Sequence, residues 1–360
     1  MSNDDDRLRP LRDKIDNLDR QIIALLSERA SVALDVGKIK HETGAPVFRP
    51  EREQQVLKKL AGINPGPIKA EGIKAIWTEI MSACRSVEAI QTVAYLGPIG
   101  TFSEEAASKF FGSGTHQKSC QTLDEIFRQV ESDHSEFGVV PIENSSEGVI
   151  SRTLDLLLES NVTIIGEVSL PIRHNLLSLH GRMEDAVQVL AHPQALAQCQ
   201  QWLNSHVPQL QRQAVASNGE AAKLAALNPQ YLAIASMNAA QSYGLQILCE
   251  GIQDDLHNRT RFVVIGKQAC GPSGRDQTSL ILSVANQPGA VYRLLAPLDE
   301  FNVSMNRFES RPARTGTWEY YFYIDIDGHQ TDVNVAKALD KLKTIAAYYK
   351  CLGSYSKSSL

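Results

Sequence analysis

Apolar residues recur in steps of three and four between positions 8 and 39, and this spacing predicts one long amphipathic helix. The apolar positions are Leu8, Leu11, Ile15, Leu18, Ile22, Leu25, Val32, Val36 and Ile39. A heptad seam of this kind predicts a partner helix. Two further helices are expected in residues 1–91. One carries Arg52 and Glu53, and the other runs from about 69 to 90, after the breaker at 64–67.

From position 92 to about 272, short apolar runs of strand length alternate with helical stretches. This order predicts α/β layers with a parallel sheet. Strands are expected at 92–96, 137–142 and 262–265, and a helix at 149–158. Helix-start signals occur at Thr101, Thr122 and Ser217, each with glutamate three residues later, and at His192-Pro193.

After a glycine- and proline-containing linker at 271–274, the pattern changes again. Strands are expected at 279–285, 303–310, 318–326 and 348–352, and helices at 291–301 and 333–346. This βαββαβ order predicts a ferredoxin-like α+β layer. The chain is therefore expected to contain three domains, at 1–91, 92–272 and 273–360.

Composition and charge narrow the functional classes. The chain has 360 residues, 43% hydrophobic and 21% charged, which is typical of soluble globular proteins of two or three domains. A net charge of -5 gives no reason to expect nucleic acid as a partner. Six scattered cysteines without a CxxC pair favour reduced thiols in a cytoplasmic protein, without a metal site. Neither a signal peptide nor a membrane span is expected, because no apolar run has the required length.

The polar stretch 143–148 lies between a predicted strand and a predicted helix. Asn144 and Glu147 have the spacing of a helix cap, so a purely structural role competes with a ligand site. Similar polar junctions at 100–103, 192–198 and 258–262 favour the ligand site, because ligands bind beyond strand ends in α/β sheets. Gly97 and Gly100 do not form a dinucleotide or P-loop motif, so no nucleotide cofactor is expected.

Cationic side chains on the long predicted helix are a second candidate site. Arg29 occupies a seam position and therefore needs a charged partner or an anionic ligand. Lys40 lies about three turns later on the same face, whereas Arg12 points about 100° away and could serve a site of another subunit. A helical dimerisation module with an interfacial salt bridge is the structural alternative.

The motifs of this segment resemble the all-helical chorismate mutase domain. They are Leu11-Arg-Asp-Lys-Ile-Asp, Leu25-Leu-Ser-Glu-Arg29, Val36-Gly-Lys-Ile-Lys40 and Pro50-Glu-Arg-Glu53. The resemblance implies an intertwined helical dimer in which Arg12 crosses to the partner's site. It implies that the substrate contacts are Arg12, Arg29, Lys40, Arg49, Arg52, Glu53, Cys84 and Glu88. Family members commonly have aspartate, serine and glutamine where this chain has Arg49, Cys84 and Glu88.

The central segment resembles prephenate dehydratase in residues 97–103, Pro141-Ile-Glu-Asn-Ser145 and Asn258-Arg-Thr-Arg-Phe262. The resemblance implies two α/β lobes around a cleft, similar to periplasmic binding proteins. It implies that Thr260 is closest to catalysis, in a site lined by Thr101, Glu143, Asn144, Ser145, Gln198 and Arg261. Thr260 could supply a proton through a relay, and Arg261 is the candidate for binding a substrate carboxylate.

Two motifs of the last segment resemble the phenylalanine-binding motifs of the ACT regulatory domain. The implied effector residues are Gly289, Ala290, Val291, Glu309, Ser310, Arg311 and Pro312. A bare dimerisation domain is the alternative on fold alone.

The three segments together resemble the bifunctional chorismate mutase–prephenate dehydratase family. The resemblance implies rearrangement of chorismate to prephenate and conversion of prephenate to phenylpyruvate, by a homodimer or higher oligomer inhibited by L-phenylalanine. A non-catalytic amino-acid sensor and a dehydratase that acts on arogenate remain the alternatives. Glu88 adds one chemical condition, because only its protonated form could donate a hydrogen bond to the substrate's ether oxygen.

Overall fold

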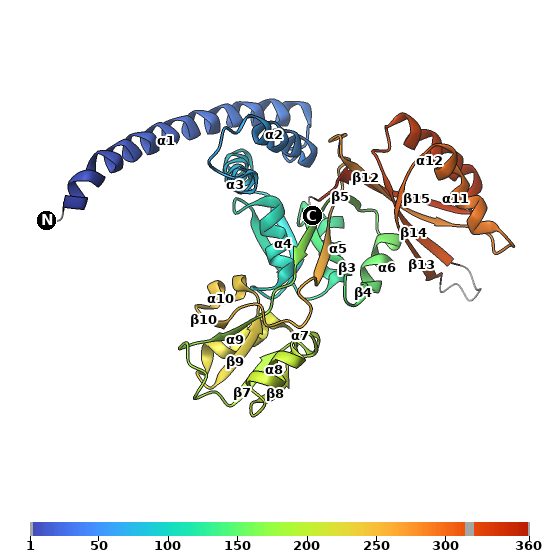
Figure 1. Ribbon diagram of the computed structural model, residues 1–360. Coiled ribbons are helices and arrows are strands. Elements are labelled where there is room, and N and C mark those ends of the chain that lie inside the picture. The colour runs from blue at the N-terminus through green and yellow to red at the C-terminus, as the bar shows by residue number, and fades with distance from the viewer. Residues whose placement is uncertain (1–2, 314–319, 359–360) are drawn as a thin grey trace. The chain divides into compact units, whose positions relative to one another are not determined.

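The computed structural model describes residues 3–313 and 320–358, and its chain divides into two compact units (Figure 1). The first unit comprises Met1–Arg49, Val56–Gln91 and Phe111–Thr115, and the second comprises Pro50–Gln55, Thr92–Phe110 and His116–Leu360. Among the described residues, no helix combines the length and apolar character needed to cross a bilayer.

The first unit is helical, as the apolar spacing predicts. Its helices are α1 (Asn3–Thr43), α2 (Pro50–Ile63), whose first residues belong to the second unit, and α3 (Ala70–Glu88). The nine apolar seam residues of α1 are between 43% and 65% exposed in the single chain. A water-exposed seam of this length is unfavourable, because each apolar side chain left in water forgoes about 1.5–3 kcal/mol of burial.

Helix α3 approaches α1 closely at a glycine. A Cβ atom added at Gly37 would lie 2.9 Å from the Cγ atom of Glu88. The absence of a side chain at position 37 therefore lets the C-terminal turn of α3 reach the C-terminal part of α1. This approach brings Glu88 beside Lys40.

The first sheet of the second unit is mixed. Its order is β2-β1-β3-β11-β5, with β4 paired to β3. The strands are β1 (Thr92–Leu96), β2 (His116–Cys120), β3 (Phe137–Asn144), β4 (Gly148–Val149), β5 (Thr163–Pro171) and β11 (Arg259–Gly266). The accompanying helices are α4 (Phe102–Phe111), α5 (Leu123–Glu131) and α6 (Ser151–Glu159).

The second sheet has the order β10-β6-β9-β7-β8. Its strands are β6 (Asn175–Ser178), β7 (Gln188–Ala191), β8 (Gln211–Ala214), β9 (Tyr231–Ala235) and β10 (Gln246–Cys249). Its helices are α7 (Pro193–Gln198), α8 (Gln200–His206), α9 (Asn218–Leu227) and α10 (Met237–Tyr243). The predicted helix starts at Ser217 and His192-Pro193 are confirmed, because both residues cap the helices that follow them.

Three expectations for this region are wrong. The first sheet is not wholly parallel, because β11 returns from the second sheet and runs antiparallel to both β3 and β5. Strands β3 and β11 are also longer than the apolar runs suggest, so Glu143, Asn144, Thr260 and Arg261 lie within strands. The helix expected from position 149 begins at Ser151, so Asn144 does not cap it.

The third sheet has the order β13-β14-β12-β15 and the predicted βαββαβ sequence of elements. The elements are β12 (Asp276–Ser283), α11 (Ala290–Glu300), β13 (Met305–Pro312), β14 (Tyr320–Asp327), α12 (Val333–Ile345) and β15 (Tyr348–Ser356). The expected strand start at Trp318 lies outside the described residues. Helices α11 and α12 pack against one face of this sheet, around Leu294, Phe322 and Leu339 (Figure 1).

The opposite face of the third sheet packs against the first sheet. Ile281, Tyr323, Leu352 and Tyr355 share one buried cluster with residues of β3, β11 and α6. Gly353 permits the close approach, because a Cβ atom there would lie 2.5 Å from the backbone oxygen of Ile164 on β5. The first and third sheets thus share one hydrophobic core.

Candidate functional site

A cavity of about 470 Å³ is lined by residues of both the first and the second sheet and their loops. Four of the predicted dehydratase residues line it: Thr101, Asn144, Gln198 and Thr260. Thr101 lies at the start of α4, Gln198 ends α7, and Asn144 and Thr260 lie on paired strands. The cavity also contains His174, His192, Glu147, Ser217 and Ser236, which come from neighbouring loops and helix starts.

Thr260 and Asn144 are directly opposite each other in the register of β11 and β3. The amide nitrogen Nδ2 of Asn144 donates to the Thr260 Oγ1 atom at 2.8 Å and to the Asn258 Oδ1 atom at 2.9 Å. Both side chains are buried, with Thr260 only 8% exposed. Asn144 therefore orients the Thr260 hydroxyl at the wall of the cavity.

The hydrogen of the Thr260 hydroxyl has no acceptor within the described part of the chain, while its oxygen accepts from Asn144. A hydroxyl held in this way can donate to a ligand in the cavity. Asn144 cannot accept from Thr260 instead, because its Oδ1 atom accepts from the backbone N–H groups of Ser146 and Glu147. The geometry thus leaves one oriented donor facing the ligand space.

His174 is a cavity residue that the sequence reasoning missed. Its Nε2 atom lies 2.9 Å from Gln198 Oε1, and Gln198 Nε2 donates to Glu147 Oε1 at 3.4 Å. Burial lowers the pKa of His174 below its ordinary value, although the hydrogen bond with Gln198 opposes this shift. The signal in the sequence was the polar Arg173-His174 junction between two apolar runs, which resembles the other junctions of this region.

Among the described residues, no lysine or arginine lines this cavity. The N-terminal ends of two longer helices line it instead, at Phe102 and Ser103 of α4 and at Asn218 of α9. Backbone N–H groups and the positive dipole end of a helix favour carboxylates. In the described chain, no group of three or more His, Cys, Asp or Glu side chains is placed to hold a metal ion.

The remaining three predicted dehydratase residues do not line the cavity. Arg261 is bound by the carboxylates of Glu167 and Asp325, and Glu143 pairs with Arg307. The Ser145 hydroxyl accepts from the backbone N–H of Arg259. The interpretation of Arg261 as a substrate-binding cation is therefore corrected, because successive residues of a strand point to opposite faces and Thr260 faces the cavity.

The predicted mutase residues occupy several parts of the helices. Lys40 Nζ contacts Glu88 Oε2 at 3.1 Å and donates to the Val47 carbonyl at 2.9 Å, and Cys84 is buried one turn before Glu88. Arg29 is half-buried, whereas Arg12 is exposed and bonded to Asp5. Arg49 precedes α2, and Arg52 and Glu53 lie in its first turn.

Position 12 and position 40 of α1 are separated by a rise of about 42 Å at 1.5 Å per residue. Because α1 is one continuous helix, Arg12 cannot reach Lys40 of its own chain. Arg29, Lys40 and Glu88 lie closer to one another than any of them lies to Arg12. Only a second chain could bring Arg12 beside them.

A smaller cavity of about 230 Å³ lies in the C-terminal sheet layer. Three predicted effector residues line it, Gly289, Ala290 and Val291, together with Tyr320 and Phe322 of β14. The other predicted effector residues, Glu309 to Pro312, lie on edge strand β13 and do not line it. Arg311 instead pairs with Asp155 of α6 at 2.8 Å.

Comparisons with protein families match three parts of the chain. The model of chorismate mutase type II matches residues 11–89, that of prephenate dehydratase matches 93–270, and that of the ACT domain matches 278–344. The ACT match includes Gly289 to Val291 and Glu309 to Pro312, and the dehydratase match includes Thr260 and Asn144.

Curated relatives match nearly the full length of the chain. A bifunctional chorismate mutase/prephenate dehydratase of Neisseria gonorrhoeae is 46% identical over 359 residues, covering 99% of both chains. Among solved structures, the prephenate dehydratase of Arthrobacter aurescens in complex with L-Phe is 32% identical, with a TM-score of 0.68 over 74% of this chain and 89% of that one. The quorum-quenching acylase GqqA is 29% identical, with a TM-score of 0.69 over 74% of this chain and 98% of that one. Because full-length identity is this high, the chain belongs to the bifunctional chorismate mutase/prephenate dehydratase family.

Proposed function

We propose that the chain rearranges chorismate to prephenate in its helical part and converts prephenate to phenylpyruvate in the cavity that contains Thr260. The observation that carries the second step is the Asn144–Thr260 pair, which holds one buried hydroxyl donor at the cavity wall. We also propose the domain limits 1–91, 92–272 and 273–360, in line with the three matched families, and a place of action in the cytoplasm. In the described chain, none of the six cysteines forms a disulfide, which supports the cytoplasm, where thiols stay reduced.

In the dehydration, the bond between the ring carbon and its hydroxyl breaks, and so does the bond to the ring carboxylate. The electron pair of the second bond enters the ring, which becomes aromatic, and carbon dioxide and water leave. The departing hydroxyl takes up a proton, and the Thr260 hydroxyl is the group oriented to donate to it. Since threonine is a weak acid, a water molecule or a second group must give a proton to Thr260 as Thr260 donates its own to the departing hydroxyl. The helix starts of α4 and α9 hold the substrate carboxylates.

In the rearrangement, the ether bond of chorismate breaks while a carbon–carbon bond forms in the same molecule. Cationic side chains can catalyse this step by holding both carboxylates in place and by stabilising the negative charge that develops on the ether oxygen. Arg29 and Lys40 are the proposed cations, and Arg12 of a second copy completes the site. The contacts implied for Arg49, Arg52, Glu53 and Cys84 stay predictions.

The proposed homodimer follows from the exposed seam of α1. Nine apolar residues along one face need a partner, and Arg12 is too far from Lys40 along its own helix to join it. The molar mass in solution, measured by light scattering, tests the dimer, and the mass of a single chain at micromolar concentration would contradict it.

Glu88→Gln is expected to lower the KM for chorismate roughly fivefold, with the dehydratase unchanged. The Glu88 carboxylate pairs with Lys40 and repels a dianion, and a unit charge about 4 Å away is worth at least about 1 kcal/mol, its value in bulk water. Mutase kinetics at a fixed pH measure the effect, with Glu79→Gln on the same helix as the matched control. If KM and kcat of Glu88→Gln equalled those of the unaltered protein, Glu88 would lie outside the site.

The effector site is proposed in the cavity lined by Gly289, Tyr320 and Phe322, which offers apolar surface for the ring of L-phenylalanine. Gly289 has φ +75°, a conformation that a β-branched residue adopts only with strain. Gly289→Val is therefore expected to abolish phenylalanine binding in calorimetry and to remove inhibition, while dehydratase kcat without phenylalanine stays unchanged. Normal phenylalanine binding by this variant would show that the effector site is not in this cavity.

One assay separates the alternatives for the whole protein. Purified protein supplied with chorismate is expected to yield prephenate first and then phenylpyruvate. Formation of neither product would favour the non-catalytic sensor. Faster turnover of arogenate than of prephenate at equal concentration would assign the dehydratase to that substrate instead.

A further inference from the structure

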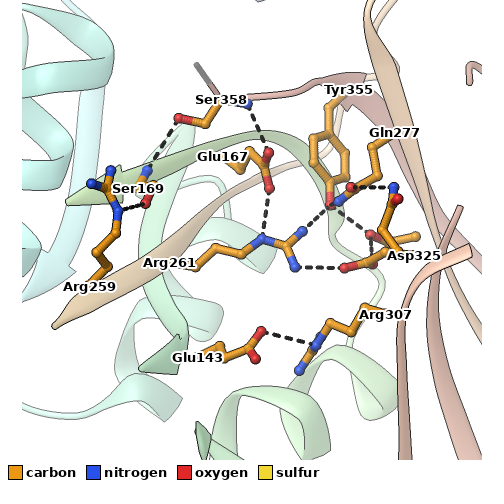
Figure 2. Close-up of polar contacts among 12 residues, drawn as sticks. Glu143, Glu167, Ser169, Arg259, Arg261, Gln277, Arg307, Asp325, Tyr355 and Ser358 are labelled. Atoms are coloured by element: carbon orange, nitrogen blue, oxygen red, sulfur yellow. Dashed lines mark hydrogen bonds and ion pairs between the residues drawn. The ribbon is translucent and has the colours of Figure 1, made fainter. Parts of the chain in front are cut away.

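Four charged residues form an alternating arrangement between the first and the third sheet (Figure 2). Glu143 and Arg261 are directly opposite each other on β3 and β11, and Arg307 and Asp325 are directly opposite each other on β13 and β14. Arg307 Nε contacts Glu143 Oε2 at 3.2 Å, and Arg261 Nη1 donates to Asp325 Oδ2 at 2.6 Å. The β3–β11 pair of the first sheet is therefore bound to the β13–β14 pair of the third sheet by two salt bridges.

Arg261 is the most fully bound member of this group. Its Nε atom donates to Glu167 at 2.7 Å, and its Nη2 atom donates to the Tyr355 hydroxyl at 3.1 Å, in addition to the bond with Asp325 (Figure 2). Burial lowers the pKa of a guanidinium, yet the acidic groups Tyr355, Asp325 and Glu167 raise the pKa of Arg261 above its ordinary value. Arg261 thus stays charged, and its donors on three sides fix the position of β11.

The residues that alternate with this group form the catalytic pair. Glu143 and Arg261 immediately precede and follow Asn144 and Thr260 along β3 and β11, and side chains of neighbouring strand residues point to opposite faces. Asn144 and Thr260 face the cavity and bond to each other there. Each ion pair thus lies one residue along the strand from the Asn144–Thr260 hydrogen bond, whose strength depends on its geometry.

Strand β14 has the same two-sided arrangement. Tyr320 and Phe322 line the proposed effector cavity, and Phe322 stacks on Phe308 of β13 at 5.2 Å. Asp325, three residues beyond Phe322, faces the dehydratase sheet, where Tyr323 joins the shared core. A ligand that repositions β14 at Phe322 acts on Asp325 through one short length of strand.

We propose that Glu143 and Arg261 are positioning residues for dehydration, and that the Arg307–Glu143 and Asp325–Arg261 pairs carry the effect of phenylalanine to Thr260. The inference rests on the proposed dehydratase and effector sites. Phenylalanine favours the sheet position in which the two pairs draw Thr260 and Asn144 out of their bonded geometry. Phenylalanine must therefore bind more tightly to this inactive sheet position than to the active one, as any allosteric inhibitor does.

Arg307→Gln and Asp325→Asn test the two links, because neither residue lines the substrate or the effector cavity. Asp325→Asn keeps the side chain's size and Arg307→Gln keeps a shorter polar chain without the charge. Arg261 retains Glu167 when Asp325 is neutralised, so the fold is expected to persist. Phenylalanine should bind with unchanged affinity in calorimetry, yet the concentration that halves dehydratase activity should rise at least about tenfold. Arg307→Lys keeps the charge and should keep most of the inhibition.

Arg261→Lys tests the positioning role itself. Loss of the three-sided guanidinium contacts should lower dehydratase kcat about tenfold with little change in the KM for prephenate, because no substrate contact is removed. Asp155→Asn is the matched control, since its pair with Arg311 links helix α6 to β13 of the third sheet and neither residue lines the substrate or the effector cavity. Its kcat should equal that of the unaltered protein.

The outcomes are distinct. If the unaltered protein formed no phenylpyruvate or ignored phenylalanine, the proposed function would fail, and this inference with it. If the unaltered protein responded normally and Arg307→Gln and Asp325→Asn were inhibited equally well, only the proposed links would be wrong. A loss of inhibition accompanied by a loss of phenylalanine binding would likewise overturn the links, because it places the two residues in the effector site.

Discussion

Thr260→Ala is expected to lower dehydratase kcat by about 10²–10⁴-fold while mutase activity stays intact. The Thr260 hydroxyl is the donor that Asn144 orients toward the cavity, and a positioned proton donor typically contributes that factor. The substitution should not disturb the surrounding structure, because Asn144 Nδ2 keeps its bond to Asn258 Oδ1 at 2.9 Å. Steady-state kinetics with prephenate measure the effect, and chorismate consumption measures the mutase.

Two further variants distinguish a chemical role of Thr260 from a packing role. Thr260→Ser keeps the hydroxyl and should retain activity within about tenfold, whereas Thr260→Val keeps the shape and should be as inactive as alanine. If valine supported normal turnover, the hydroxyl would take no part in the reaction. The family assignment would survive that result, because it rests on the whole sequence.

Four of the seven predicted dehydratase residues line the cavity, and the directions of the strand residues beside them were not predictable from apolar runs. Those runs locate β3 and β11, yet both strands extend into polar residues, so the apolar pattern alone predicts a loop at Thr260 and Arg261. The alternation of Arg259, Thr260, Arg261 and Phe262 carried the missing information, because a period of two places Thr260 and Phe262 on one face. Phe262 and Thr260 both line the cavity, as that period requires.

Other features depend on contacts that no local pattern encodes. The pairing of Arg261 with Asp325 joins residues 64 positions apart, and it exists only because the third sheet packs on the first. The spacing of polar residues at 143–148 suggested a helix cap, and Asn144 Oδ1 does accept from the backbone N–H groups of Ser146 and Glu147. No local pattern shows, however, that Asn144 Nδ2 bonds to Asn258 and Thr260 across the sheet.

In the helical part, the secondary structure was predictable from the sequence, but the complete site is not visible in a single chain. The seam on α1 and the breaker before α3 predicted both helices, since periodicity sustained from position 8 to 39 is a strong signal. In the proposed dimer, the mutase site contains residues of both chains, so a single chain does not hold the complete site. The exposed seam and the cation Arg29 on its face are the two features of a single chain that point to that assembly.

Arg29→Ala is expected to lower mutase activity by about 2.7–4 kcal/mol of transition-state stabilisation, or roughly 10²–10³ in kcat, with dehydratase activity unchanged. The guanidinium lies half-buried on the seam of α1, where an unpaired cation is costly and a dianionic substrate would bind it. Arg20→Ala is the matched control, because Arg20 lies on the same helix but is exposed and off the seam.

The structural alternative for Arg29 is an interfacial salt bridge, and the two roles predict different outcomes. A substrate-binding arginine leaves the dimer mass unchanged on replacement, and Arg29→Lys recovers part of the activity by restoring the charge without the planar fork. A purely structural arginine gives the reverse: the variant dissociates at lower protein concentration, and mutase activity returns when the concentration is raised. Light scattering and mutase kinetics over the same concentration range separate these cases. Full activity in an undissociated Arg29→Ala dimer would contradict both roles and would leave Lys40 as the principal cation of the site.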